Sequence, residues 1–105
     1  MERVSFVLHI RPEDRDEYIR RHEAVYPELL QAFGEVGIRT YSIFLHGGVL
    51  FAYMEVDNYR EAMDALAVHP ANGKWQAYMS DLLLLNEAGT TSEDIPEVFH
   101  YEYRG

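Results

Sequence analysis

The side chains of this sequence that could transfer protons near neutral pH are its histidines, because imidazole titrates closest to that range. The chain has five of them: His9, His22, His46, His69 and His100. His9 and His100 fall in predicted strands, where hydrogen-bonded structural roles are the simpler interpretation. His46 lies in a predicted turn and His69 between two predicted helices, and we expect both to be exposed and inert. His22 differs from the others because of its neighbours.

Tyr18 and His22 are four residues apart in a predicted helix. This spacing places both side chains on one helix face, roughly 5–6 Å apart. The helix ends soon afterwards, before Tyr26 and Pro27, so the polar tips of the pair can reach the rim of a cavity. A helix C-terminus also favours a protonated imidazole. On spacing alone, packing in the core or at the surface remains the simpler explanation of the pair.

Aromatic residues form a second group of candidates. Trp75 and Tyr78 lie at helical spacing, and the chain contains 8 Tyr and 5 Phe beside its 1 Trp. A tryptophan on an amphipathic helix belongs to the core more often than to a ligand site. Tyrosines, however, combine apolar ring faces with hydroxyl tips, which suits the C–H faces and hydroxyl groups of a polyol.

Several kinds of chemistry are excluded or disfavoured. The absence of cysteine excludes disulfides, thiolate metal sites, cysteine nucleophiles and iron–sulfur clusters. The chain has no glycine-rich phosphate loop, no HExxH pair and no G-x-S-x-G elbow. Glycosidase chemistry with two carboxylates needs a long cleft, which a domain of this size rarely forms. We therefore expect acid–base chemistry with no cofactor and no metal.

The charge balance restricts the partners. With 9 basic and 18 acidic residues, the formal net charge is −9, which repels phosphate backbones and anionic lipids. No apolar stretch approaches the roughly 20 residues of a membrane span. We expect a cytoplasmic protein with a small-molecule partner, and no nucleic-acid or membrane partner.

The length of 105 residues allows one domain over residues 1–105. Alternating residues predict strands at 4–10, 38–45 and 49–56, and a last strand at 97–103 after a loop at 84–96. Helices are predicted at four places: from Pro12 to about residue 24, at 27–37, at 58–68 behind a capping box of Asn58 and Glu61, and at 70–84.

The resulting order, β-α-β-β-α-β, predicts an α+β fold of the ferredoxin-like type with an antiparallel sheet. Its strands are apolar on both alternations, with Val7 beside Phe6 and Phe44 beside Ile43. A sheet with one face in water should alternate cleanly. We therefore expect a second copy of the chain to cover the open face, giving a homodimeric α/β barrel.

The segment EYIRRHEAVYPEL, residues 17–29, closely resembles the L-rhamnose mutarotase family. The resemblance extends over nearly the whole chain, through the segments TYSIF, LFAYMEV, KWQAYMSD and EVF. It implies a dimeric ferredoxin-like fold and interconversion of the α and β anomers of L-rhamnose without a cofactor. It also implies that His22 is the proton donor and that Tyr18, Tyr41 and Trp75 contact the sugar.

One departure from the family pattern concerns the sugar. Where a branch of the family has two consecutive tryptophans, this chain has Trp75 and Gln76. The change replaces an apolar wall by an amide, so we expect Gln76 to contact the substrate and to influence which sugar is preferred.

Opening a pyranose requires a proton on the ring oxygen and removal of the proton from the anomeric hydroxyl. General acid–base groups supply about 10²–10⁴-fold each, so one histidine and a partner suffice. We expect His22 to donate to the ring oxygen, and the base is left open among a water, Tyr41 and a carboxylate. The alternatives are a cofactor-independent monooxygenase of the same barrel architecture and a sugar-binding protein without catalytic activity.

Overall fold

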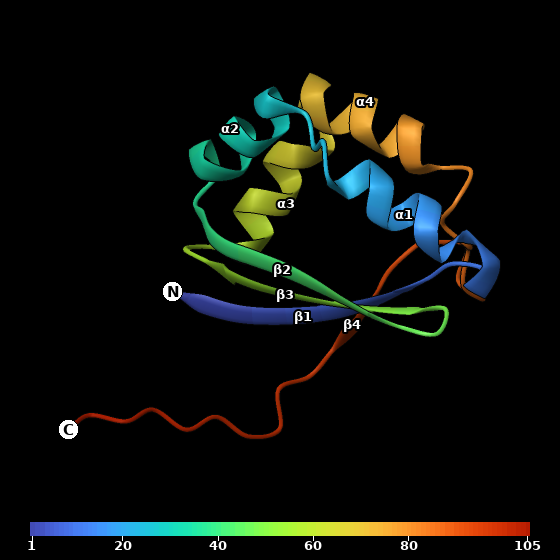
Figure 1. The fold of residues 1–105 in the computed structure, drawn as a ribbon. Coiled ribbons are helices and arrows are strands. Elements are labelled where there is room, and N and C mark those ends of the chain that lie inside the picture. Colours follow the sequence, from blue (N-terminus) through green and yellow to red (C-terminus); the bar gives the residue numbers. More distant parts are fainter.

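β1 (Glu2–His9) and β3 (Val49–Val56) form the centre of a four-stranded antiparallel sheet. The computed structural model describes residues 1–105. β2 (Ile38–His46) and β4 (Glu93–Ile95) lie at the two edges, in the order β2-β3-β1-β4. Helices pack on one face of this sheet and leave the other face open (Figure 1). The predicted α+β, ferredoxin-like class is confirmed.

The helical layer consists of four α-helices and one short 3-10 turn. The turn is η1 (Pro12–Asp14), and the helices are α1 (Arg15–His22), α2 (Pro27–Glu35), α3 (Tyr59–Ala67) and α4 (Pro70–Met79). Proline occupies the first turn of α2 and of α4, where its missing N–H costs nothing. The predicted cap of α3 forms as expected, since the Asn58 side chain accepts a hydrogen bond from the Glu61 amide at 3.0 Å.

Helix ends account for the smaller differences from prediction. α1 ends at His22, two residues before the predicted end. α2 ends at Glu35, and Gly37 follows with φ of 91°, a conformation that glycine adopts without strain. α4 ends at Met79 rather than at residue 84, because the chain turns back and Leu83 forms a β-bridge with Ile10.

The predicted last strand at 97–103 is wrong. The sheet instead takes its fourth strand from the predicted loop, where Glu93–Ile95 pairs with Val7–Ser5 of β1. Pro96 follows and cannot donate to a ladder. Residues 97–103 leave the sheet and are exposed, and Figure 1 shows this segment running away from the rest of the molecule.

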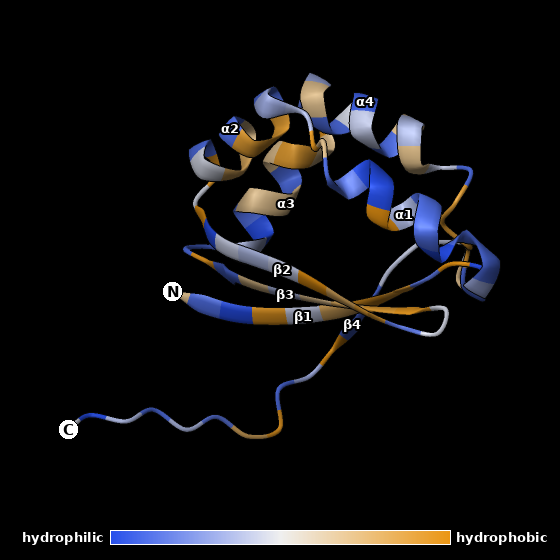
Figure 2. Ribbon diagram, viewed as in Figure 1, coloured by the Kyte–Doolittle hydropathy of each residue, from blue (hydrophilic) through white to orange (hydrophobic).

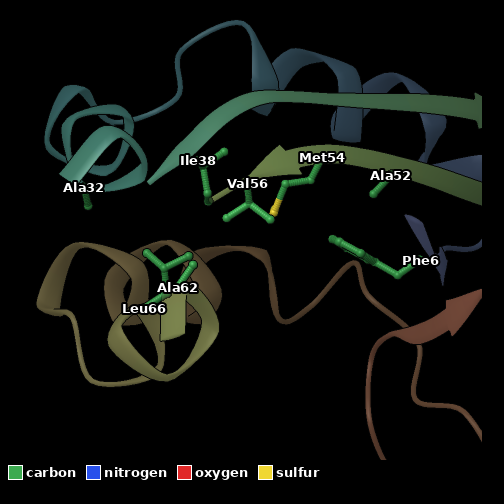
Figure 3. Close-up of a cluster of buried hydrophobic side chains, with 8 residues drawn as sticks. All are labelled: Phe6, Ala32, Ile38, Ala52, Met54, Val56, Ala62 and Leu66. Carbon is green, nitrogen blue, oxygen red and sulfur yellow. The ribbon is translucent and has the colours of Figure 1, made fainter. Parts of the chain in front are cut away.

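The core lies between the sheet and the helices and contains only apolar side chains and Tyr18 and Trp75. It has two parts. Figure 3 shows the first, in which strands meet α2 and α3 through Phe6, Ala32, Ile38, Ala52, Met54, Val56, Ala62 and Leu66. The second joins the strands to α1, α2 and α4 through Ile10, Tyr18, Leu29, Leu50, Ala71, Trp75, Met79 and Leu82.

The other face of the sheet carries an apolar patch. Phe44 and Phe51 are paired across β2 and β3 and remain 66% and 41% exposed. Val7 is paired with Phe51 and is half-buried. Figure 2 shows apolar residues along much of the length of the strands. The apolar pattern that motivated a second copy is therefore present on the uncovered face.

Met54 provides a test of the core. It is 1% exposed within the first cluster, so Met54→Ala should remove packed atoms, leave a cavity and lower the free energy of unfolding by about 2–5 kcal/mol. Denaturant unfolding followed by circular dichroism measures this change. Val68→Ala is the control, since Val68 is 82% exposed and its change should stay within about 0.5 kcal/mol. Equal effects of the two substitutions would contradict this description of the core.

Candidate active site

A cavity of about 720 Å³ lies between the sheet and the helical layer, over the edge strand β2. Most of its lining is apolar. β2 contributes six residues to it, namely residues 38–41, Ile43 and Leu45. A few polar side chains interrupt this lining: Tyr18, His22, Glu23, Arg39, Thr40, Tyr41 and Trp75. Concave, mostly apolar sites with a few convergent polar groups are typical of small-molecule binding.

Tyr18 and His22 share the inner face of α1, as their spacing predicted. Their rings stack, with centroids 4.3 Å apart and planes at 25°. Trp75 of α4 approaches His22 edge to face, with centroids 5.2 Å apart. Tyr26, the N-cap residue of α2, packs edge to face against Trp75 at 5.1 Å. Side chains from α1, from α4 and from the start of α2 thus form one aromatic group.

The tautomer of His22 is set by the backbone. Its Nδ1 lies 3.0 Å from the carbonyl oxygen of Tyr18. A carbonyl can only accept, so Nδ1 carries the hydrogen and donates it. Nε2 has no hydrogen-bond partner in the protein, which leaves its lone pair available in the neutral ring. Burial lowers the pKa of His22 below its ordinary value of 6.5, and the hydrogen bond to Tyr18 opposes this shift only in part.

The two tyrosines in the cavity are neutral hydroxyl groups at physiological pH. Burial raises the pKa of Tyr18 to about 12, and burial also raises the pKa of Tyr41. The Tyr41 ring packs against Phe6 and Phe33, with centroids 6.2 Å and 5.4 Å apart. Neither hydroxyl has a hydrogen-bond partner in the protein. Both can therefore bind a ligand as donor or acceptor, but neither can serve as a base near pH 7.

Arg21 is a residue that the sequence reasoning missed. Its Nε donates to Glu17 at 2.6 Å, and its Nη1 donates to the Tyr78 carbonyl at 2.7 Å. Both terminal nitrogens also reach the carboxylate of Asp81, at 2.8 Å and 3.1 Å. The guanidinium lies 4.6 Å from the centroid of the Tyr78 ring. Arg21 thus ties α1 to the C-terminal end of α4, which holds His22 against Trp75.

The remaining candidates lie elsewhere. Gln76 is exposed, its nearest polar partner is Asn72 at 3.5 Å, and it is not part of the cavity lining. His46 is exposed, as expected. His69 is half-buried, contrary to expectation, because its Nδ1 caps α4 by accepting from the Ala71 amide at 3.1 Å. His9 and His100 are exposed.

Comparison with known proteins bears on this arrangement. The family model described as L-rhamnose mutarotase matches residues 3–101. The chain belongs to the L-rhamnose mutarotase family. A curated L-rhamnose mutarotase of Ligilactobacillus salivarius is 38% identical over 95% of this chain and 97% of the relative. The crystal structure of an L-rhamnose mutarotase from Formosa agariphila is 30% identical, covers 97% of this chain and 100% of that one, and superposes with a TM-score of 0.82.

A more distant structural neighbour shares only the fold. An antibiotic biosynthesis monooxygenase superposes with a TM-score of 0.64 at 16% identity, over 93% of this chain and 99% of the other. Such a likeness shows the architecture and not the reaction. No helix of the chain has the length and apolarity that crossing a membrane requires.

The Arg21 contacts generate a prediction. Arg21→Ala removes the link between α1 and α4 and should lower kcat/KM for the reaction of this site by about 10- to 100-fold, because small displacements of reacting groups are costly. It should also lower the midpoint of thermal unfolding. Steady-state kinetics and a thermal melt measure the two effects.

Arg20→Ala is the matched control. Arg20 is the preceding residue on the same helix and also pairs with Glu17, but its side chain is 63% exposed and makes neither the Tyr78 carbonyl contact nor the Asp81 contact of Arg21. It should leave kcat/KM nearly unchanged. If both variants behave alike, Arg21 does not position the site.

Proposed function

We propose that this protein interconverts the α and β anomers of L-rhamnose. The observation that carries the proposal is the position of His22, Tyr18, Tyr41 and Trp75 around one cavity, in a chain whose family is named for that reaction. Anomer interconversion needs only proton transfer, which these side chains supply without redox chemistry.

The reaction moves one proton between two neighbouring oxygens. When the pyranose opens, the anomeric hydroxyl loses its proton, the bond from the anomeric carbon to the ring oxygen breaks, and the ring oxygen gains a proton. The aldehyde then rotates about its bond to the next carbon and closes on the other face by the reverse steps. The ring oxygen and the anomeric hydroxyl oxygen are both bonded to the anomeric carbon, so a single group placed beside that carbon can reach both.

We assign His22 as the proton donor to the ring oxygen and propose that the anomeric hydroxyl supplies its proton. With Nδ1 donating to the Tyr18 carbonyl, the neutral ring offers the lone pair of Nε2. This nitrogen takes the proton from the anomeric hydroxyl and delivers it to the ring oxygen, so His22 begins and ends neutral. The raised pKa of Tyr41 argues against Tyr41 as the base.

The other side chains bind and orient the sugar in this proposal. Tyr18 and Tyr41 hydrogen-bond to sugar hydroxyls through their unpartnered phenol groups. Trp75 packs against a C–H face of the pyranose, as aromatic rings do with sugars. The apolar lining accepts the methyl group of a 6-deoxy sugar. Gln76 is exposed and lies outside the cavity lining. Its contact with the sugar therefore stays a prediction.

We further propose that the protein acts as a homodimer in the cytoplasm. The support for the dimer is the apolar open face of the sheet, where Phe44 and Phe51 are exposed. A second copy packed on this face buries the same residues from both sides. The support for the cytoplasm is the absence of cysteine, which is common in compartments where disulfides do not persist.

His22→Gln tests the function. Saturation-transfer NMR on the anomeric protons of L-rhamnose, L-fucose and L-lyxose should show accelerated exchange with the native protein, fastest for L-rhamnose. His22→Gln should reduce the catalysed rate by about 10²–10⁴-fold. Glu23→Gln is the comparison variant, since Glu23 is an exposed carboxylate in the cavity lining and the proposed relay does not use it.

The alternatives give different results in the same experiments. A sugar-binding protein would show affinity without accelerated exchange, and a monooxygenase would consume oxygen with an aromatic substrate. Exchange that survives in His22→Gln removes His22 from the mechanism. Exchange lost in Glu23→Gln makes that carboxylate the base.

The pH profile tests the relay itself. Because burial lowers the pKa of His22 below 6.5, the ring is neutral at pH 7 and above. The catalysed rate, after subtraction of the spontaneous one, should be constant above about pH 7 and should fall as the pH drops through the His22 pKa. A rate that rises on acidification would show that the imidazolium is the starting form, which contradicts the relay.

A further inference from the structure

The start of β2 departs from the regular alternation of a strand. Ile38 pairs with Val56 of β3. Thr40, two residues further on, pairs with Glu55, which is only one residue away from Val56. Arg39 is therefore an extra residue without a counterpart on β3, as in a β-bulge. The bulge explains why the first four residues of β2 line the cavity one after another, whereas a regular strand presents only alternate residues to one side.

A carboxylate fixes the plane of the Arg39 guanidinium. Nε of Arg39 donates to Oδ1 of Asp57 at 3.0 Å, and Nη2 donates to Oδ2 at 2.7 Å. The Asp57 amide in turn donates to the Gly37 carbonyl at 2.9 Å. A Cβ atom at residue 37 would lie 3.2 Å from Oδ2 of Asp57, so glycine lets the carboxylate keep its place beside β2. The hydrogen bonds from Arg39 lower the pKa of Asp57 below its ordinary value of 3.8, and both groups are charged at neutral pH.

This ion pair leaves donors free at the cavity. Its side chains are 63% and 49% exposed, and pairs as open as this one contribute little to folding stability. Asp57 takes two of the five N–H donors of the guanidinium, and the other three have no hydrogen-bond partner in the protein. Arg39 is the only lysine or arginine in the cavity lining. Its fixed donors are therefore available to a molecule bound in the cavity.

The chemistry of the pair favours a neutral polyol over an anion as its ligand. Asp57 balances the charge of Arg39, so the attraction for a phosphate or carboxylate is reduced. The guanidinium, however, holds its N–H groups in a rigid planar fork, whose spacing also suits the oxygens of two neighbouring sugar hydroxyls. His22 comes from α1 in the helical layer, whereas Arg39 comes from β2. The two residues thus belong to different walls of one cavity.

We propose that Arg39, held by Asp57, donates hydrogen bonds to the hydroxyls at C3 and C4 of the sugar and selects the configuration at C4. This inference rests on the proposed function, in which His22 acts at the anomeric carbon. C4 is the ring atom opposite the anomeric carbon, so a ring that meets His22 with one edge turns its C4 edge toward the other wall. Arg39 is then a substrate-binding residue, and Asp57 is a positioning residue that acts through it.

Two analogues of L-rhamnose separate this contact from the apolar ones. L-Lyxose has the same hydroxyl configuration but lacks the methyl group, and 6-deoxy-L-talose keeps the methyl group but is inverted at C4. Arg39→Met keeps an apolar stem and removes the donors. It should raise KM for L-rhamnose and L-lyxose about 5- to 10-fold and change KM for 6-deoxy-L-talose less than about two-fold. The kcat for L-rhamnose should stay within about two-fold, because the contact is equal in the ground and transition states.

A double-mutant cycle tests the role of Asp57. Asp57→Asn removes the charge and one acceptor of the fork, and it should raise KM for L-rhamnose about 2- to 5-fold. Added to Arg39→Met, it should cause no further rise, since a residue that acts only through Arg39 has nothing left to position. Arg15→Met is the matched control and should leave KM unchanged. Arg15 also pairs with an aspartate, Asp16, at 3.1 Å, and is 59% exposed, but it lies outside the cavity lining.

Several results would overturn the proposal. An unchanged KM in Arg39→Met means that the guanidinium does not touch the sugar. An equal rise of KM for all three sugars means that Arg39 shapes the cavity without selecting at C4. Independent effects of the two substitutions in the cycle mean that Asp57 does not act through Arg39. If a thermal melt shows that Arg39→Met is unfolded, Arg39→Lys takes its place, because lysine keeps the charge but not the fork.

Titration calorimetry separates this inference from the proposed function. If the native protein does not accelerate anomer exchange, the proposed function fails, and the Kd values of L-rhamnose for the native protein and Arg39→Met still decide the role of Arg39. If the native protein accelerates exchange and Arg39→Met has the same constants for all three sugars, the inference fails and the function stands. A native protein that neither binds L-rhamnose nor accelerates its exchange contradicts both.

Discussion

The hydrogen bond from His22 to the carbonyl of Tyr18 is the contact on which the site depends. It joins two residues of the same helical turn at 3.0 Å, so the geometry of α1 itself orients the imidazole. The bond fixes the hydrogen on Nδ1 and leaves Nε2 without a protein partner. Burial then keeps the ring neutral by lowering its pKa. A neutral ring with a free Nε2 can take and return a proton, and the donor and the base are then the same atom.

That bond is useful only while α1 keeps its place against α4, and the surrounding fold provides this. Arg21 reaches from α1 to the Asp81 carboxylate and the Tyr78 carbonyl, with its side chain only 11% exposed. Trp75 of α4 contacts His22 edge to face. The polar link and the aromatic contact thus both join α1 to α4, while β2 lines the cavity.

The limits of sequence reasoning follow from the range of each interaction. Tyr18 and His22 were predictable because helical spacing is local. Trp75 was a candidate for its aromatic ring, but its sugar contact and that of Tyr41 came from the family resemblance, since nothing local indicates that β2 and α4 meet at His22. Arg21 gave only the weak signal of Glu17 four residues before it, and its partner Asp81 lies 60 residues away. The strand pattern at 97–103 was visible, but a pattern does not state which sheet it joins, and the chain's own sheet takes residues 93–95 instead.

The mostly apolar lining bears on why such a site would favour a 6-deoxy sugar. Anomer exchange already proceeds in water, so a modest acceleration by one imidazole suffices and the remaining demand on the site is selectivity. A methyl group can pack on apolar side chains such as Ile43 and Leu45 of β2. A hydroxymethyl group in the same place would bury a hydroxyl without a partner, which costs on the order of 1–3 kcal/mol in proteins. Discrimination would then come from the absence of polar groups in one part of the cavity rather than from an added contact.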